Sequence, residues 1–187
     1  MEKGKEEPKS KFPIVMVIVG VIMGLIIAFI SSVAIHKTSD KNFCGMCHTM
    51  QPMVDAYKMD VHGGAGYHGM EVKCVDCHLP HDSIMNYLLT KMQTGFHDIY
   101  AQNFYDLDKI DWNEKRKHRE HFVYDSSCLA CHTNLRDATM SNLKAFRGHK
   151  AYFEGSTKKT CVSCHENVGH KNLGSHLPKQ INKMKEK

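Results

Sequence analysis

The cysteines of this 187-residue chain all belong to one kind of motif. Eight cysteines form four C-x-x-C-H sequences, each with its own histidine, and none remains for a disulfide. This spacing puts two thiols and an imidazole on one short stretch of backbone, which is the pattern of covalent haem c attachment. The four motifs are Cys44/Cys47/His48, Cys74/Cys77/His78, Cys128/Cys131/His132 and Cys161/Cys164/His165.

Zinc is the alternative to haem at such motifs, because cysteine and histidine are also the usual zinc ligands. A single C-x-x-C-H can arise by chance or hold zinc, but four motifs that use every cysteine favour haem. We therefore predict four covalently bound haem c groups. Because haem c is attached on the outer face of bacterial membranes, we expect the motif-bearing part to lie outside the cytoplasm.

Haem iron has two axial positions, and the motif histidine usually supplies the first ligand. Of the 14 histidines, ten lie outside the motifs and are candidates for the second position. His170 follows His165 too closely to bend back onto the same iron, so we assign it to a neighbouring haem. Met50 stands two residues beyond the first motif and either ligates the first iron or packs on its porphyrin.

The N-terminal part predicts a membrane anchor. Residues 12–35 carry no charge, and a helix of this length at ~1.5 Å per residue crosses the ~30 Å hydrocarbon layer. A cleaved signal peptide is the alternative, since Ser32, Val33 and Ala34 resemble a cleavage site, but its apolar region has only about 7 to 15 residues. Lysines before the span predict a cytoplasmic N-terminus. We expect a cytoplasmic tail at 1–11, a transmembrane helix at 12–35 and an extracytoplasmic tetrahaem domain at 36–187.

The expected fold class is mainly α, with a single N-terminal transmembrane helix and a small haem-packed domain of short helices and long loops. Four porphyrins in one small domain must form much of its apolar core, so little or no sheet is expected. The net charge of +5 is opposed by the haem propionates. It therefore does not indicate nucleic-acid binding.

Two helices are predicted within this domain. In residues 84–104, apolar side chains recur every four positions from Ile84 to Phe104, and Asp82 or Ser83 can cap the start. Residues 134–153 also predict a helix. Its expected packing residues are Leu135, Leu143, Phe146 and Phe153.

The first of these helices carries two charged residues that could take part in a reaction. Lys91 and Asp98 are seven residues apart, so they share nearly one face and stand roughly 10 Å apart along the axis. Quinol oxidation releases two protons and two electrons, and it needs a proton acceptor, a polar partner and a nearby haem. Lys91, Asp98 and the first haem can supply these. The alternative is an ordinary amphipathic helix with two exposed charges.

These motifs together resemble the NapC/NirT family of membrane-anchored multihaem quinol dehydrogenases. The resemblance rests on the anchor, the four haem motifs, the Met50 spacing, C-H-L-P-H at 77–81 and C-V-S-C-H-E-N-V-G-H at 161–170. Residues 91–98, K-M-Q-T-G-F-H-D, resemble the K-x-x-x-G-x-x-D pattern of the NrfH branch, the small subunits of cytochrome c nitrite reductase. NapC-like members tend to lack that glycine.

The resemblance implies a set of iron ligands. Met50, rather than His48, would ligate the first haem, with Asp98 on its distal side and Lys91 in a menaquinol pocket. The motif histidines would ligate the other three haems. Their second ligands would be His149 or a partner-subunit lysine for the second haem with His78, His170 for the third with His132, and His68, or alternatively His62, for the fourth with His165.

The resemblance also implies a function. Menaquinol would be oxidised at the membrane, and four haems would pass the electrons to the pentahaem catalytic subunit of a nitrite reductase that forms ammonium. One alternative is a NapC- or CymA-like donor to other reductases, such as nitrate reductase. Another is a plain membrane-tethered electron carrier without a quinol site.

Overall fold

The computed structural model describes residues 12–65 and 70–177. The chain divides into two compact units, with the boundary between Ser39 and Asp40. Helices dominate both units, and the described residues contain no strand, only an isolated antiparallel bridge between Gly63 and Glu71. The predicted mainly helical fold with little sheet is therefore confirmed.

The first unit contains one long helix, α1, which spans Phe12–Lys37. The helix has 26 residues, and none of them is buried. Its most apolar stretch of 18 residues has a mean hydropathy of 3.0. Beyond its end, the Thr38 and Ser39 hydroxyls donate hydrogen bonds back to carbonyls of the last turn. By length and composition, α1 can cross a membrane. The helix predicted at residues 12–35 is present and extends two residues further, to Lys37.

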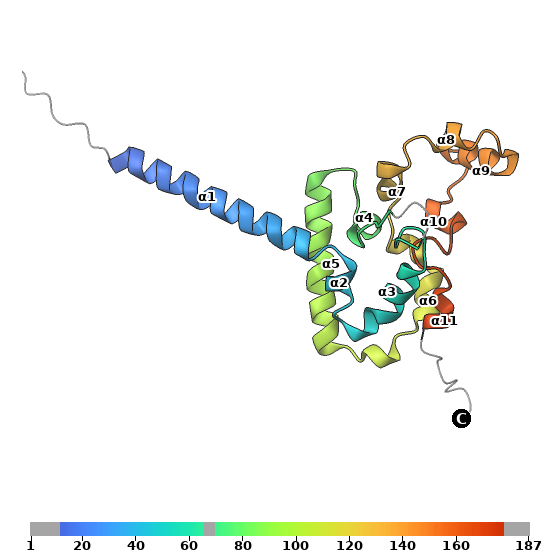
Figure 1. Cartoon of the computed structure of the whole chain (residues 1–187), viewed down its shortest axis with the longest axis horizontal. Coiled ribbons are helices and arrows are strands. Elements are labelled where there is room, and N and C mark those ends of the chain that lie inside the picture. The colour runs from blue at the N-terminus through green and yellow to red at the C-terminus, as the bar shows by residue number, and fades with distance from the viewer. Residues whose placement is uncertain (1–11, 66–69, 178–187) are drawn as a thin grey trace, which may run out of the picture. The chain divides into compact units, whose positions relative to one another are not determined.

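The second unit is built from short helices and one long helix, which lies at one edge of the unit (Figure 1). The long helix, α5, spans Ile84–Phe104, and the Ser83 hydroxyl caps it by accepting from the Asn86 amide at 3.1 Å. This confirms the predicted helix and decides between the two predicted caps. The remaining elements are α2 (Lys41–Cys44), η1 (His48–Met50), α3 (Gln51–Lys58), α4 (Val75–His78), η2 (Leu107–Lys109), α6 (Trp112–Lys117), η3 (Arg119–His121), α7 (Asp125–Cys131), α8 (Leu135–Ala138), α9 (Leu143–Phe153), α10 (Cys161–Cys164) and α11 (Leu173–His176).

The helix predicted at 134–153 is two helices, α8 and α9. Asn142 lies between them in an extended conformation, and its side chain accepts a hydrogen bond from the Ala145 amide at 3.1 Å, which starts α9. An asparagine that caps a helix competes with the helical backbone on its N-terminal side. Leu143 and Phe153, predicted to pack, are 61% and 42% exposed.

Few apolar side chains are buried in the second unit. The buried set among the described residues is Val54, Ala56, Tyr57, Leu79, Val162, Leu173 and Leu177. The contact between α3 and α11 supplies the only cluster in this part of the chain, with Ala56 fully buried against Leu173 and Leu177. Such a small protein core is what a domain organised around porphyrins requires.

Candidate haem sites and the charge pair on α5

Each haem motif lies on a short helix or beside its end. Cys44 ends α2, which Asp40 caps by accepting from two backbone amides. Cys77 and His78 lie in α4, Cys128 and Cys131 in α7, and Cys161 and Cys164 in α10. In the last two motifs, one turn of helix brings the two cysteines to the same side and leaves the histidine at the helix end. This is the local arrangement that two thioether bonds to one porphyrin need.

Cys47 of the first motif departs from this arrangement. The sequence predicts it as a thioether cysteine like the other seven, but the structure does not place it on a helical turn with Cys44. The helix α2 ends at Cys44, where the Gly45 amide donates to the Lys41 carbonyl at 2.9 Å and closes the last turn. Cys47 follows in an extended conformation just before η1, and its side chain is exposed, whereas that of Cys44 is half-buried. Its thioether bond to the first haem stays a prediction.

Three motif histidines each lie against a histidine from elsewhere in the chain. His78 lies beside His170 with ring centroids 6.1 Å apart. His132 lies beside His62 at 6.2 Å, and His165 beside His149 at 6.1 Å. A metal–imidazole nitrogen bond is about 2 Å long, so two imidazoles on opposite sides of one ion have centroids about 6 Å apart. All three pairs therefore fit a six-coordinate haem iron with two histidine ligands.

Hydrogen bonds at the other ring nitrogen support this fit. The Nδ1–H of His78 donates to the Phe122 carbonyl at 2.8 Å, and the Nδ1–H of His170 donates to the Met53 carbonyl at 2.9 Å. A carbonyl can only accept, so Nδ1 carries the proton in both rings and Nε2 keeps a free lone pair. Metal-binding histidines are typically oriented in this way by a partner at the second nitrogen.

The two other non-motif histidines also have a partner at Nδ1. In His62 this nitrogen lies 3.0 Å from the carboxylate of the buried Asp60, and in His149 it lies 3.3 Å from the Thr139 hydroxyl. Burial lowers the pKa of His78 and of His170, and His170 lowers that of His78 further. A lowered pKa keeps the imidazole neutral, which is the form that binds iron.

The pairs differ from the ligand sets that the family resemblance implied. His170 was expected on the third haem with His132, and the structure places it beside His78 of the second motif. His149 was expected beside His78, and the structure places it beside His165 of the fourth motif. His62, the alternative for the fourth haem, lies beside His132 instead. His68 lies outside the described residues.

Sequence distance explains the difference. The Met53 carbonyl on α3 orients His170, 117 residues away. The Phe122 carbonyl orients His78, 44 residues away. Such long-range contacts have no local signal in the sequence. The ten candidate histidines alone therefore did not determine which ring serves which iron.

The first motif lacks such a pair. Within residues 12–65 and 70–177, no second imidazole lies against His48, which is exposed at the start of η1. Met50 is half-buried at the end of η1, where α3 begins. The structure therefore leaves Met50 and the side chains of α5 as the candidates around the first haem.

Both charges of α5 act on the first motif. The pKa of the Cys44 thiol falls to about 7, mainly through its hydrogen bond with the Cys74 thiol; among weaker influences, Lys91 lowers it and Asp98 raises it. Lys91 is half-buried, and burial lowers the pKa of its ammonium group. Asp98 is exposed and lies 3.6 Å from the His97 ring. Both members of the predicted pair thus act electrostatically on Cys44, and Lys91 is half-buried whereas Asp98 is open to solvent.

Gly95 lies between Lys91 and Asp98, and no neighbouring protein atom would clash with a larger residue there. A Cβ built at this position meets no protein atom within 4 Å. Because Gly95 has no side chain, the helix backbone is uncovered between Lys91 and Asp98. A planar ring can approach the helix backbone closely there.

Asp125 is a structural residue that the sequence reasoning missed. It is the first residue of α7, and one carboxylate oxygen accepts from the Cys161 amide at 2.9 Å. The other oxygen accepts from the Tyr152 hydroxyl at 2.8 Å. A single carboxylate therefore connects the third motif, the fourth motif and α9. Its place three residues before Cys128 is the only local signal, and it does not reveal these distant partners.

Comparison with known proteins identifies relatives of the same architecture. The profile described as "NapC/NirT cytochrome c family, N-terminal region" matches residues 7–175. The tetraheme c-type cytochrome CymA of Shewanella oneidensis is 31% identical over 178 residues, covering 88% of this chain and 94% of its own. The NrfH subunit of cytochrome c nitrite reductase from Nitratidesulfovibrio vulgaris is 26% identical over 156 residues, covering 83% of this chain and 82% of its own.

A solved structure is also similar. The crystal structure of a cytochrome c nitrite reductase NrfHA complex bound to the HQNO inhibitor contains a chain that is 25% identical, with a TM-score of 0.52. The match covers 83% of this chain and 90% of that one. Other relatives are longer, since this chain spans only 46% of the TorY cytochrome of Escherichia coli O157:H7.

Proposed function

Because the chain belongs to the NapC/NirT cytochrome c family, we propose that this membrane-anchored cytochrome oxidises a quinol, menaquinol, beside its first haem. Four haems then pass the electrons to a separate reductase outside the cytoplasm. One observation carries the proposal: Lys91 and Asp98 lie close to Cys44, at the one motif whose histidine has no second imidazole against it among the described residues. A haem bound there would accept the two quinol electrons one at a time.

Lys91 and Asp98 have different tasks in this reaction. The half-buried Lys91 ammonium donates a hydrogen bond to a quinol oxygen and orients the ring. The Asp98 carboxylate, whose side chain is 82% exposed, accepts the proton that each hydroxyl loses and returns it to water. Met50, at the end of η1, would hold the first iron. The protons therefore leave on the outer side of the membrane.

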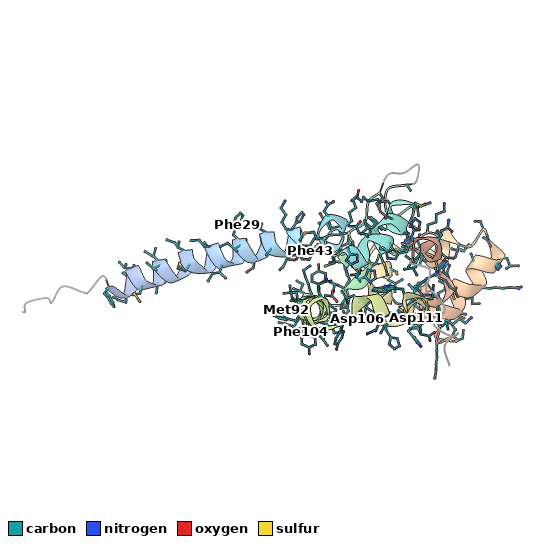
Figure 2. The ribbon with its side chains drawn as sticks, turned by 90° about the horizontal axis from the view of Figure 1, so that it is seen from below. Phe29, Phe43, Met92, Phe104, Asp106 and Asp111 are labelled. Atoms are coloured by element: carbon teal, nitrogen blue, oxygen red, sulfur yellow. The ribbon has the colours of Figure 1, made fainter. Side chains whose placement is uncertain are left out.

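The surface of α5 supports entry of the quinol from lipid. Met85, Met92 and Phe96 lie on one side of the helix and are 66%, 53% and 73% exposed. Figure 2 views α5 end-on and labels Met92 and Phe104 on its outer side. Only residues 38–40 separate α1 from α2, which ends in Cys44. The chain therefore keeps the first motif within reach of the membrane surface if α1 spans the bilayer with its N-terminus in the cytoplasm.

Two terminal partners are supported by different observations. The Lys91–Gly95–Asp98 spacing and the similarity to an NrfHA complex favour the pentahaem catalytic subunit of nitrite reductase. The pairing of His78 with His170 favours a CymA-like donor to several reductases, because the second haem then needs no lysine from a partner subunit. Stable co-purification with a pentahaem reductase supports the first. Exchange of electrons with several reductases without a stable complex supports the second.

The quinol site is tested by Lys91→Ala and Asp98→Ala in the haem-loaded protein in nanodiscs. We expect menaquinol oxidation to fall at least about tenfold in each, the size of effect seen when one proton-transfer or orienting group is lost. Lys109→Ala, which removes an exposed lysine elsewhere, should keep its rate. Haem content and absorption spectra must match the parent protein. Parental rates in both variants would contradict the site.

Spectroscopy separates this proposal from a plain carrier. A tether with four bis-histidine haems would show only low-spin iron and would ignore quinone-like inhibitors. The proposal instead expects one haem whose spectrum differs from the other three and responds to such an inhibitor. It also expects Met50→Ala to change that haem alone.

A further inference from the structure

One segment beside the fourth haem motif is rich in basic side chains. Residues 134–160, which contain α8 and α9, carry six basic and two acidic side chains, a net charge of +4 against +5 for the whole chain. We name this segment the basic lobe. Its basic side chains are all exposed: Arg136, Lys144, Arg147, Lys150, Lys158 and Lys159.

The basic lobe is directly attached to the fourth haem motif. His149 on α9 lies beside His165, with ring centroids 6.1 Å apart and planes within 19° of parallel. Tyr152, one turn further along α9, donates to Asp125, which also accepts from the Cys161 amide. His149, a candidate ligand of the fourth haem, and three of these cations, Lys144, Arg147 and Lys150, thus belong to one helix.

The four motifs form a row in which the basic lobe and α5 occupy opposite ends. Cys44 and Cys74 interact electrostatically, the Ser127 hydroxyl donates to the Leu79 carbonyl at 2.5 Å, and α7, which carries the third motif, contacts α10, which carries the fourth. These contacts connect the first motif to the second, the second to the third and the third to the fourth. Both views place α5 and the helices α8 and α9 on opposite sides of the second unit (Figures 1 and 2).

We propose that the basic lobe is the docking surface for a soluble electron acceptor with an acidic patch, and that electrons leave the protein from the fourth haem. When bound, the fourth haem would supply one electron to the acceptor, so that its iron would be oxidised from ferrous to ferric as the acceptor is reduced. Clustered charge of one sign attracts an oppositely charged partner and raises its association rate. The inference rests on the proposed function in one respect: it assumes that the electrons go to a separate protein.

Haem propionates are the competing explanation for these cations. A lysine or arginine that pairs with a propionate would stabilise the charge of that haem, and its loss would change the haem reduction potential. A cation that serves docking would change the association rate and its dependence on salt, while the potential stays constant. The two roles therefore give different measurements.

The test reverses charge at two places by the same amount. One variant of the full haem-loaded protein carries Lys144→Glu, Arg147→Glu and Lys150→Glu in the basic lobe. The control carries Lys109→Glu, Lys115→Glu and Lys117→Glu, exposed lysines of η2 and α6. Both variants in nanodiscs are reduced with dithionite, and their oxidation by acidic plastocyanin or by basic mitochondrial cytochrome c is followed by stopped flow.

We expect the lobe variant to lose at least about tenfold in rate with plastocyanin at low salt, with no loss toward the basic acceptor. The control should lose no more than about threefold, because its lysines belong to η2 and α6 and not to α9, the helix that carries His149. Equal losses in both variants, or no loss in the lobe variant, would overturn the proposal. A shift in haem potential that accounts for the slower rate would overturn it as well.

Failure of the proposed function would remain distinguishable from this result. Dithionite reduces the haems without a quinol, so the stopped-flow rates do not depend on Lys91 or Asp98. The same variants can be tested for menaquinol oxidation, which the lobe substitutions should leave unchanged.

Discussion

The two ends of the motif-bearing unit present opposite surfaces beside their haems. At the first motif, α5 exposes apolar side chains, including Met92 and Phe96, and adds one lysine and one aspartate near Cys44. At the fourth motif, α9 exposes Lys144, Arg147 and Lys150 around a histidine that faces His165. An apolar surface suits a substrate that dissolves in lipid, and a basic surface suits a charged protein in water.

The difference extends to the candidate iron ligands. The fourth motif has two imidazoles in place, which suits a haem that only carries electrons. The first motif has no second imidazole among the described residues and has titratable side chains nearby instead. A reaction that releases protons needs such groups, whereas electron transfer between haems does not. The proposed entry and exit sites thus differ in their candidate ligands as well as in their surfaces.

The largest expected effect concerns the paired histidines. His149→Ala or His62→Ala should each convert one low-spin haem to a high-spin haem that binds carbon monoxide when reduced, because each removes one of two imidazoles. Electron paramagnetic resonance and carbon monoxide titration measure this change. His121→Ala, which removes an exposed histidine outside these pairs, is the control and should convert none. An unchanged spectrum for His149→Ala would break the contrast between the two ends.

A second prediction concerns the apolar side of α5. Met92→Lys with Phe96→Lys should lower the rate with lipid-dissolved menaquinol several-fold, because lysine is costly at a lipid-facing surface. Oxidation of a water-soluble quinol should change little, since Lys91 and Asp98 remain.

Leu143→Lys with Phe153→Lys is the matched control for this prediction. These residues are also exposed apolar side chains, 61% and 42%, but they belong to α9. Equal rates with both quinols in the α5 variant would mean that the apolar side of α5 does not contact lipid. The two ends would then not differ in the way that their surfaces suggest.

The helical fold and the position of α5 could be predicted because their signals are local. A four-residue apolar period and a serine cap define Ile84–Phe104 without reference to the rest of the chain. The four haem motifs are equally local. The break at Asn142 was missed because an asparagine within an apolar pattern gives only a weak signal until its side chain is seen to cap α9.

The histidine pairs were beyond local reasoning. Each pair joins residues at least 16 positions apart, as with His149 and His165, and the choice depends on how helices pack around haems. Family resemblance supplied the candidates His62, His149 and His170 but arranged them differently. The carbonyls of Met53 and Phe122, which orient two of the rings, carry no side-chain information at all.

The smallest expected effect concerns the connection between α9 and the fourth motif. Tyr152→Phe removes the hydroxyl that donates to Asp125 at 2.8 Å and should cost about 1.5 to 3 kcal/mol of local stability, the range for a hydrogen bond to a charged group. Hydrogen exchange of the α9 amides measures this cost. The control Tyr105→Phe changes an exposed tyrosine.

The same bond predicts a dependence on pH. Burial and then Asp125 raise the pKa of Tyr152 above its ordinary value of 10.0, so the folded state favours the protonated phenol. Its contribution is therefore fully present below about pH 10 and is lost as the pH rises above that value. The parent protein and Tyr152→Phe should differ in α9 protection near pH 7 and converge under alkaline conditions. Equal α9 protection in the two proteins near pH 7 would show that the hydroxyl does not hold α9, and the basic lobe, to the fourth motif. A difference that stays constant at high pH would contradict the predicted loss of the bond on deprotonation.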